Sequence, residues 1–175
     1  MKVIMAMVMS IDGKITQGGD SVASKWASKE DQNYFFSLLR THRLMIMGSN
    51  TYNVARDKIR LEKDRLRIVL TRHPEKYAKY SVPGKLEFSN KSPRQLVNFF
   101  QAKKYKTMLL IGGGTINSAF LAENLVDELY LTIEPKIFGR GKSLVGETKL
   151  NTNLKLVEMK KLNTQGTLLL HYKVL

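Results

Sequence analysis

The sequence has no cysteine, so it forms neither disulfide bonds nor thiolate metal sites. Histidine is also rare: His42, His73 and His171 lie far apart and show no HxH or HExxH spacing, so no metal is expected. No apolar run approaches the roughly 20 residues that span a bilayer, and MKVIMAMVMSIDGK lacks the small-residue cleavage site of a signal peptide. We therefore expect no membrane partner and a cytoplasmic location.

Acidic residues are scarce relative to basic ones. The chain has 29 Lys and Arg against 15 Asp and Glu, which gives a net charge of +14. Such a balance suggests an anionic partner, either nucleic acid, a membrane surface or a phosphorylated small molecule. The basic residues are spread along the chain, and this favours a solvated surface. A basic nucleic-acid-binding module is the alternative, and it predicts duplex binding with a steep salt dependence.

What is present is the pattern of a single α/β domain over 1–175. Short runs rich in Val, Ile, Leu and Met predict buried strands at about 2–9, 43–47, 66–71, 107–111 and 126–134. Helical patterns run from Ser28 to about 41, from Ser92-Pro93 with an apolar side at Leu96, Val97, Phe99 and Phe100, and from Gly114 onward. This alternation predicts a mostly parallel central sheet with helices on both faces.

The C-terminal part of the chain differs from the rest. LKLVEMKKL at 154–162 and TLLLHYKVL at 167–175 flank a turn at 163–166. Two apolar runs around a short Asn- and Gly-containing turn predict an antiparallel hairpin, which would close the sheet.

Glycines gather where LLIGGGTINSAFL, at 109–121, passes from a strand into a helix. Glycine costs conformational entropy, so Gly112, Gly113 and Gly114 indicate a sharp turn or a close backbone approach. Such a turn also points N–H groups outward, as a phosphate site requires, although a tight turn with nothing bound is the alternative. MGSNTY at 47–52 and LTRHP at 70–74 follow two other strands. Ligands bind beyond such strand ends, which favours one phosphate-rich ligand.

Asp31 is the acidic residue of interest in the first predicted helix. It follows the N-cap Ser28 by three residues, which is the position of a capping box. It also shares a helix face with Phe35, where a desolvated carboxylate would have a raised pKa suited to proton delivery. On spacing alone, capping is the favoured interpretation.

Five motifs occur in one order: W-x4-D-x3-F at 26–35, MGSNTY at 47–52, LTR at 70–72, IGGGTI at 111–116 and DELYLT at 127–132. In order, spacing and position they resemble dihydrofolate reductase over nearly the whole chain. MSIDGKI at 9–15 and LVDELYLTIEPKIFGRG at 125–141 also resemble the reductase domain of riboflavin biosynthesis, the RibD C-terminal domain, which shares that fold. The resemblance implies a dihydrofolate reductase-like fold and an NADPH-dependent reductase of dihydrofolate. A ribosylaminopyrimidine phosphate is the alternative substrate.

The resemblance to dihydrofolate reductase also implies a substrate site. Its residues are Ala6, Met7, Asp31, Phe35, Arg65 and Thr132. Asp31 would hold the pterin and assist protonation of N5, and Thr132 would support that carboxylate through hydrogen bonding. Phe35 would pack against the pterin, and Arg65 would bind the α-carboxylate of the folate glutamate. The two residues of the first strand would line the nicotinamide and the pterin.

The implied cofactor is NADPH. Its implied contacts are Gly48, Ser49, Asn50, Thr51, Thr71, Arg72, Ile111, Gly112, Gly113, Gly114, Thr115 and Ile116. Ser49 stands where dihydrofolate reductases usually have a basic residue, which leaves Arg72 as the main candidate for the 2′-phosphate. Lys25 replaces a proline before Trp26, so the lid loop at 16–25 is expected to be non-standard.

The riboflavin-type alternative assigns other residues to the substrate. In that reading Asp12 and Lys14 would serve a ribose phosphate. Reductases of that type pair as dimers, and the shared segment 125–141 therefore favours a homodimer.

Overall fold

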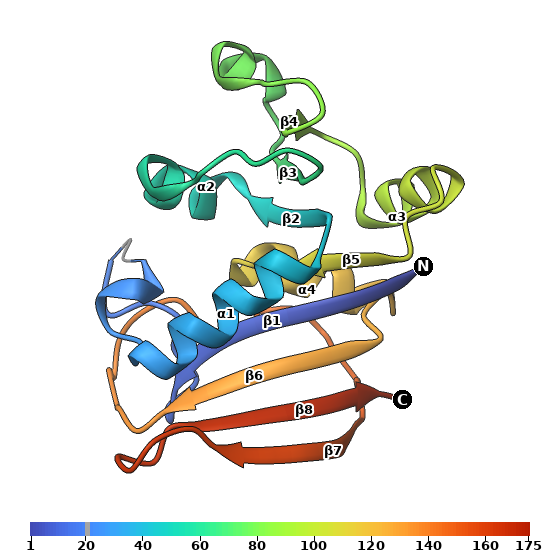
Figure 1. Ribbon diagram of the computed structural model, residues 1–175. Coiled ribbons are helices and arrows are strands. Elements are labelled where there is room, and N and C mark those ends of the chain that lie inside the picture. The colour runs from blue at the N-terminus through green and yellow to red at the C-terminus, as the bar shows by residue number, and fades with distance from the viewer. Residues whose placement is uncertain (20–21) are drawn as a thin grey trace.

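The computed structural model describes residues 1–19 and 22–175, and in this part of the chain eight strands form one sheet (Figure 1). The strand order is β4-β3-β2-β5-β1-β6-β8-β7. The strands are β1 (Lys2–Ser10), β2 (Leu44–Gly48), β3 (Leu66–Leu70), β4 (Leu86–Ser89), β5 (Thr107–Leu110), β6 (Glu128–Glu134), β7 (Leu154–Lys161) and β8 (Leu168–Val174). β1 to β6 pair in parallel, whereas β8 pairs antiparallel with both β6 and β7. The predicted mostly parallel sheet with an antiparallel C-terminal hairpin is confirmed.

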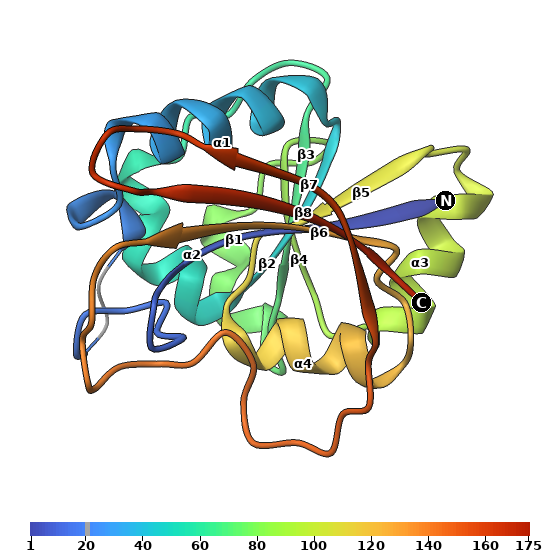
Figure 2. The ribbon, with the colours of Figure 1, turned by 90° about the horizontal axis from the view of Figure 1, so that it is seen from below.

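Helices cover both faces of the sheet, as predicted (Figure 2). The α-helices are α1 (Lys29–Thr41), α2 (Ser49–Ala55), α3 (Pro93–Ala102) and α4 (Gly114–Ala122), and the 3-10 helices are η1 (Ala23–Lys25), η2 (Arg56–Lys58) and η3 (Pro74–Tyr80). α1 lies on one face and α3 and α4 lie on the other. Tyr52 of α2 packs with Met47 and Val69, on the same face as α1.

Among the strands and α-helices, the sequence patterns do not predict β4 and α2, and Phe99 does not lie on the buried side of its helix as expected. β4 has only four residues, of which Leu86 alone is buried, and α2 is a helix of seven residues directly after a strand. Both are too short to show a hydrophobic period. In α3 the predicted apolar side is wrong at Phe99, which is 41% exposed and carries the ammonium groups of Lys91 and Lys103 over its ring.

The structure describes the predicted lid loop only in part. Residues 20 and 21 of the predicted lid loop at 16–25 lie outside the described residues. Among the helices that the structure describes, none combines the length and apolarity needed to cross a membrane.

The alternation of each strand sends its side chains to two different cores. Val3 and Met5 of β1 join the large apolar cluster under α3 and α4, whereas Ile4 and Ala6 face α1. The same alternation in β3 sends Arg67 to the face that carries α1 and α2. The polar residues of the candidate site reach that face in this way.

Candidate active site

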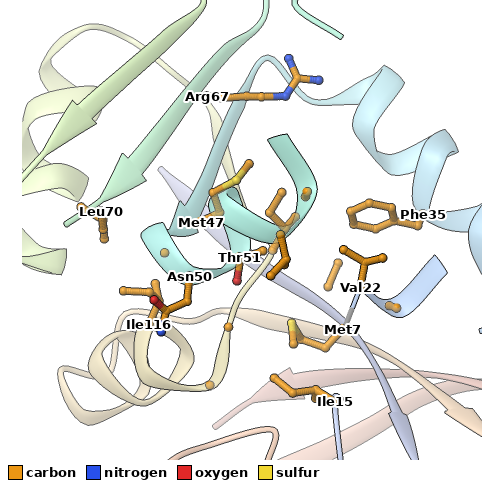
Figure 3. Close-up of a pocket in the computed structure, with 18 of the residues that line it drawn as sticks. Met7, Ile15, Val22, Phe35, Met47, Asn50, Thr51, Arg67, Leu70 and Ile116 are labelled. Atoms are coloured by element: carbon orange, nitrogen blue, oxygen red, sulfur yellow. The ribbon is translucent and has the colours of Figure 1, made fainter. Parts of the chain in front are cut away.

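A cleft of about 1650 Å³ lies at the carboxyl ends of the parallel strands, on the face that carries α1 and α2 (Figure 3). Phe35 points into it from α1, Met7 from β1 and Thr51 from α2. A pocket for one small ligand typically measures about 300–1,000 Å³. This cleft is therefore large enough for two ligands side by side.

The cleft brings together nearly all residues that the resemblance implied. Its lining includes Ala6, Met7, Asp31, Phe35, Arg65, Thr132, Gly48, Ser49, Asn50, Thr51, Thr71, Arg72, Ile111, Gly113, Gly114, Thr115 and Ile116. Gly112 lies just behind the lining, with φ at 85° and a cis peptide bond to Gly113. The φ of Gly112 lies in the left-handed region that L side chains rarely adopt, so the backbone there favours glycine, and a Cβ would also lie 2.8 Å from the sulfur of Met7.

The glycine segments place two helix starts at the cleft. Gly48 is the N-cap of α2 and Gly113 is the N-cap of α4, and neither helix has a side chain that caps it. The N–H of Gly48 donates to the carbonyl of Gly112 at 2.9 Å, which joins the two turns. Uncapped N–H groups and two convergent helix dipoles fit the phosphates of a dinucleotide. Arg72, two residues after β3, adds a cation to the lining of the cleft.

Asp31 is the buried residue of α1, all of whose thirteen residues the structure describes. The hydroxyl of Ser28 accepts from the N–H of Asp31 at 3.2 Å, but the N–H of Ser28 donates to Glu134 of β6 at 2.7 Å. Glu134 thus takes the bond that the third residue of a capping box would make. The carboxylate of Asp31 is not needed as a cap and instead lines the cleft.

The surroundings of Asp31 raise its pKa to about 6. Burial is the main cause, because a desolvated carboxylate disfavours its charged form, and the nearby Glu134 acts in the same direction. The hydrogen bond from Thr132 lowers the pKa and is outweighed. A carboxyl that holds its proton near neutral pH can serve as a general acid.

Two arginines of the cleft lining, Arg65 and Arg67, differ in their hydrogen bonding. Arg65 pairs with Glu62 and donates to the carbonyl of Arg40 at 3.1 Å. Arg67 is 5% exposed, and its Nη1 atom is buried without a partner among the described residues. Burial lowers the pKa of Arg67, but a guanidinium stays protonated in proteins. Arg67 extends from β3 into the cleft, as Figure 3 shows.

The residues proposed for a ribose phosphate, Asp12 and Lys14, do not line the cleft. The carboxylate of Asp12 accepts from the hydroxyl of Ser10 at 2.6 Å and from the N–H groups of Phe138 and Gly139 at 3.1 and 2.7 Å. Those three bonds lower the pKa of Asp12 to about 2. Asp12 therefore fixes the turn after β1 to the loop after β6, and an assignment to substrate is not supported.

Sequence reasoning missed several residues that line the cleft. Besides Arg67, they include residues at the end of β4 and after it, and residues of the loop after β6: Ser89, Asn90, Lys91, Lys142, Ser143, Val145, Gly146 and Glu147. The strand pattern indicates where Arg67 lies. It is two residues before Val69 and therefore shares a strand face with it, on a strand whose five residues are all buried. No local pattern places the other segments, since each reaches the cleft only through the fold.

The chain has the dihydrofolate reductase-like fold. A dihydrofolate reductase from Enterococcus faecalis complexed with NADP(H) superposes with a TM-score of 0.65 at 18% identity, covering 99% of this chain and 96% of that one. A putative riboflavin biosynthesis protein from Shewanella sp. PV-4 superposes with a TM-score of 0.75 at 19% identity, covering 100% and 99%. The uncharacterized protein YwjB of Bacillus subtilis (strain 168) is 24% identical over 160 residues, which cover 89% of this chain and 88% of YwjB.

The family follows from a match along the chain. Residues 1–168 match the model of the RibD C-terminal domain, so the chain belongs to the RibD C-terminal domain family. Solved structures that share this fold include reductases, which supports an oxidoreductase.

Proposed function

We propose that this protein is an NADPH-dependent reductase that reduces a C=N bond, either within a flat nitrogen heterocycle or in the imine of a ribosylamino group attached to one, with Asp31 as the acid. The observation that carries the proposal is the buried carboxyl of Asp31, whose pKa is raised by desolvation to about 6, in a largely apolar cleft wide enough for two ligands. Reduction of a C=N bond needs a hydride at carbon and a proton at nitrogen, and no nucleophile or metal takes part.

The glycine-lined half of the cleft fits the cofactor. Gly48 to Thr51 and Gly113 to Ile116 would hold the pyrophosphate through the starts of α2 and α4, and Arg72 would hold the 2′-phosphate. When bound there, NADPH supplies the hydride.

The chain's own residues supply the proton and exclude water. Asp31 releases its proton to the nitrogen that becomes basic as the neighbouring carbon is reduced, and it is reprotonated from solvent. Thr132 fixes the carboxyl by its hydrogen bond, and Phe35 presents an apolar surface to a flat ring. Holding two flat rings in contact in a water-poor cleft lowers the entropic part of the barrier.

Two substrates fit this chemistry. The family match favours a (5-phosphoribosylamino)pyrimidine, whose phosphate would be held by Arg67 rather than by Asp12 and Lys14. The combination of Asp31, Thr132 and Phe35 favours 7,8-dihydrofolate. Both substrates are flat, carry an anionic group and bind as small molecules.

The test is oxidation of NADPH by the purified protein with 5-amino-6-(5-phosphoribosylamino)uracil in one reaction and dihydrofolate in another. Steady turnover with either compound supports the reductase, and the ratio of the two kcat/KM values identifies the substrate. No oxidation of NADPH or NADH with either compound would contradict the proposal.

A further inference from the structure

Glu134 is a second buried carboxylate on the same face of the sheet as Asp31. It ends β6, is 2% exposed and does not line the cleft. Burial of a carboxylate is costly unless other groups compensate for the lost water. The residue therefore requires a physical explanation that the reductase chemistry does not supply.

The hydrogen bonds of Glu134 show that it acts only as an acceptor. One oxygen accepts from the N–H of Ser28 at 2.7 Å and the other from the hydroxyl of Thr167 at 2.8 Å. The hydroxyl of Thr167 itself accepts from the amide of Asn163 at 2.9 Å, so its single hydrogen is directed at Glu134. Both oxygens accept and neither donates, which is the pattern of an ionised carboxylate.

No cation forms an ion pair with Glu134 in the described part of the chain. Across residues 1–19 and 22–175, the same holds for Asp31. Lys136, which follows in the chain, donates its ammonium to the carbonyl of Trp26. The negative charge of Glu134 is therefore felt by its neighbours.

The other titratable groups around Asp31 do not replace that charge. Tyr34 of α1 and Tyr130 of β6 are phenols whose pKa values are raised by burial, so both are neutral at physiological pH. Glu30, in the first turn of α1, is exposed and accepts from Asn163 at 3.1 Å, and Lys29 beside it is exposed. Solvent screens exposed charges, whereas a buried carboxylate acts through a medium of low dielectric constant.

We propose that Glu134 is a positioning residue for the acid: it accepts the capping bond at the start of α1 in place of Asp31, and its buried charge disfavours a second negative charge on Asp31. This inference rests on the proposed function only in calling Asp31 the acid. Its electrostatic content concerns the proton on Asp31 and can be measured without turnover.

The test compares the titration of Asp31 in the wild type and in Glu134→Gln. The substituted amide can still accept from Ser28 and can donate to the hydroxyl of Thr167, so both hydrogen bonds are retained while the charge is removed. The carboxyl carbon resonance of Asp31, assigned by its loss in Asp31→Asn, is followed by NMR from about pH 4 to about pH 8. We expect the midpoint to fall by about one pH unit in Glu134→Gln, because a like charge has been removed.

Two control variants separate charge from structure. Thr167→Val removes a hydrogen bond to Glu134 but keeps the charge, so it should lower the melting temperature and leave the midpoint of Asp31 high. Glu134→Asp keeps the charge in a shorter side chain and should also leave the midpoint high. The inference is overturned if Glu134→Gln leaves the midpoint unchanged, or if either control lowers it as much as Glu134→Gln does.

Activity gives an independent readout. A general acid works while protonated, so turnover should fall as the pH rises through the pKa of Asp31, and this limb should move to lower pH in Glu134→Gln. If neither substrate is reduced but the NMR midpoint still moves, the proposed function fails and the role of Glu134 stands. If a substrate is reduced and the midpoint does not move, the role of Glu134 fails and the proposed function stands.

Discussion

On the face of the sheet that carries α3 and α4, the buried side chains form one continuous apolar cluster that includes Phe100, Phe120 and Leu110. On the face that carries α1 and α2, they form two smaller clusters, one around Met45 and Leu109 and one around Tyr52 and Val69. The cleft occupies the interval between those smaller clusters, and Asp31, Arg67 and Thr132 are buried around it. One sheet therefore has a face that provides stability and a face that provides chemistry.

The difference shows where this fold tolerates polar groups. Buried polar groups cost free energy unless they are hydrogen-bonded, so they gather where a ligand or a neighbouring element supplies the partner. Arg67 has an unpartnered nitrogen, whereas Glu134 is satisfied by α1 and by the hairpin. Substitutions on the two faces should accordingly affect different measurements.

The largest effect is expected at Asp31. Asp31→Asn should lower kcat about 10²- to 10⁴-fold, because an amide cannot deliver the proton. The raised pKa means that folding favours the protonated carboxyl, and that stabilisation is lost as the pH rises through about 6. The variant should therefore be at least as stable as the wild type above that pH. Glu30→Gln, in the same helical turn but exposed, is the control, and equal kcat values for both variants would exclude Asp31 as the acid.

A large loss of stability is expected for Phe120→Ala, on the face of the sheet that carries α3 and α4. Phe120 is fully buried in α4, so its truncation should lower the free energy of unfolding by about 3–5 kcal/mol. Phe99→Ala, at an exposed aromatic side chain in α3, should cost much less. Urea unfolding measures both. The molecules that remain folded should keep the wild-type KM for substrate, and a changed KM would show that the two faces are not independent.

A smaller effect is expected for binding of the anionic group of the substrate. Arg67→Met should raise KM about 10- to 100-fold while kcat changes little, because a charged hydrogen bond to substrate contributes about 1.5–3 kcal/mol. It should not destabilise the fold, since it removes a buried guanidinium whose Nη1 atom has no hydrogen-bond partner among the described residues. Arg65→Met is the matched control, as Arg65 already pairs with Glu62. A larger rise in KM for Arg65→Met than for Arg67→Met would restore the assignment that the resemblance implied.

The smallest effect concerns the cofactor. Arg72→Ala should reduce the preference for NADPH over NADH, measured as the ratio of kcat/KM values, by about 10-fold, which is the contribution of one phosphate contact. Lys76→Ala in η3, outside the cleft lining, controls for loss of a positive charge. An unaltered ratio in Arg72→Ala would place the 2′-phosphate elsewhere, with Lys91 as another cation that lines the cleft.

Local patterns in the sequence determine the secondary structure and the faces of the strands. The apolar runs predict β1, β2, β3, β5 and β6 to within about two residues, and Ser28, Ser92 and the glycine turn mark the starts of α1, α3 and α4. The order of the five motifs also carries the resemblance to reductases. The strands, the helix starts and the motifs depend on residues that are close together in the sequence, and they can therefore be predicted from the sequence alone.

Only the tertiary structure decides which of the polar residues act on one another. Ser28 and Glu134 are 106 positions apart, so no spacing predicts that Glu134 takes the capping bond and leaves Asp31 facing the cleft. Likewise, Arg65 and Arg67 are two positions apart, yet Arg65 pairs with Glu62 whereas the Nη1 atom of Arg67 is buried without a hydrogen-bond partner. Desolvation and charge pairing depend on what packs around a group in three dimensions, and this is why the proton on Asp31 is decided by the fold.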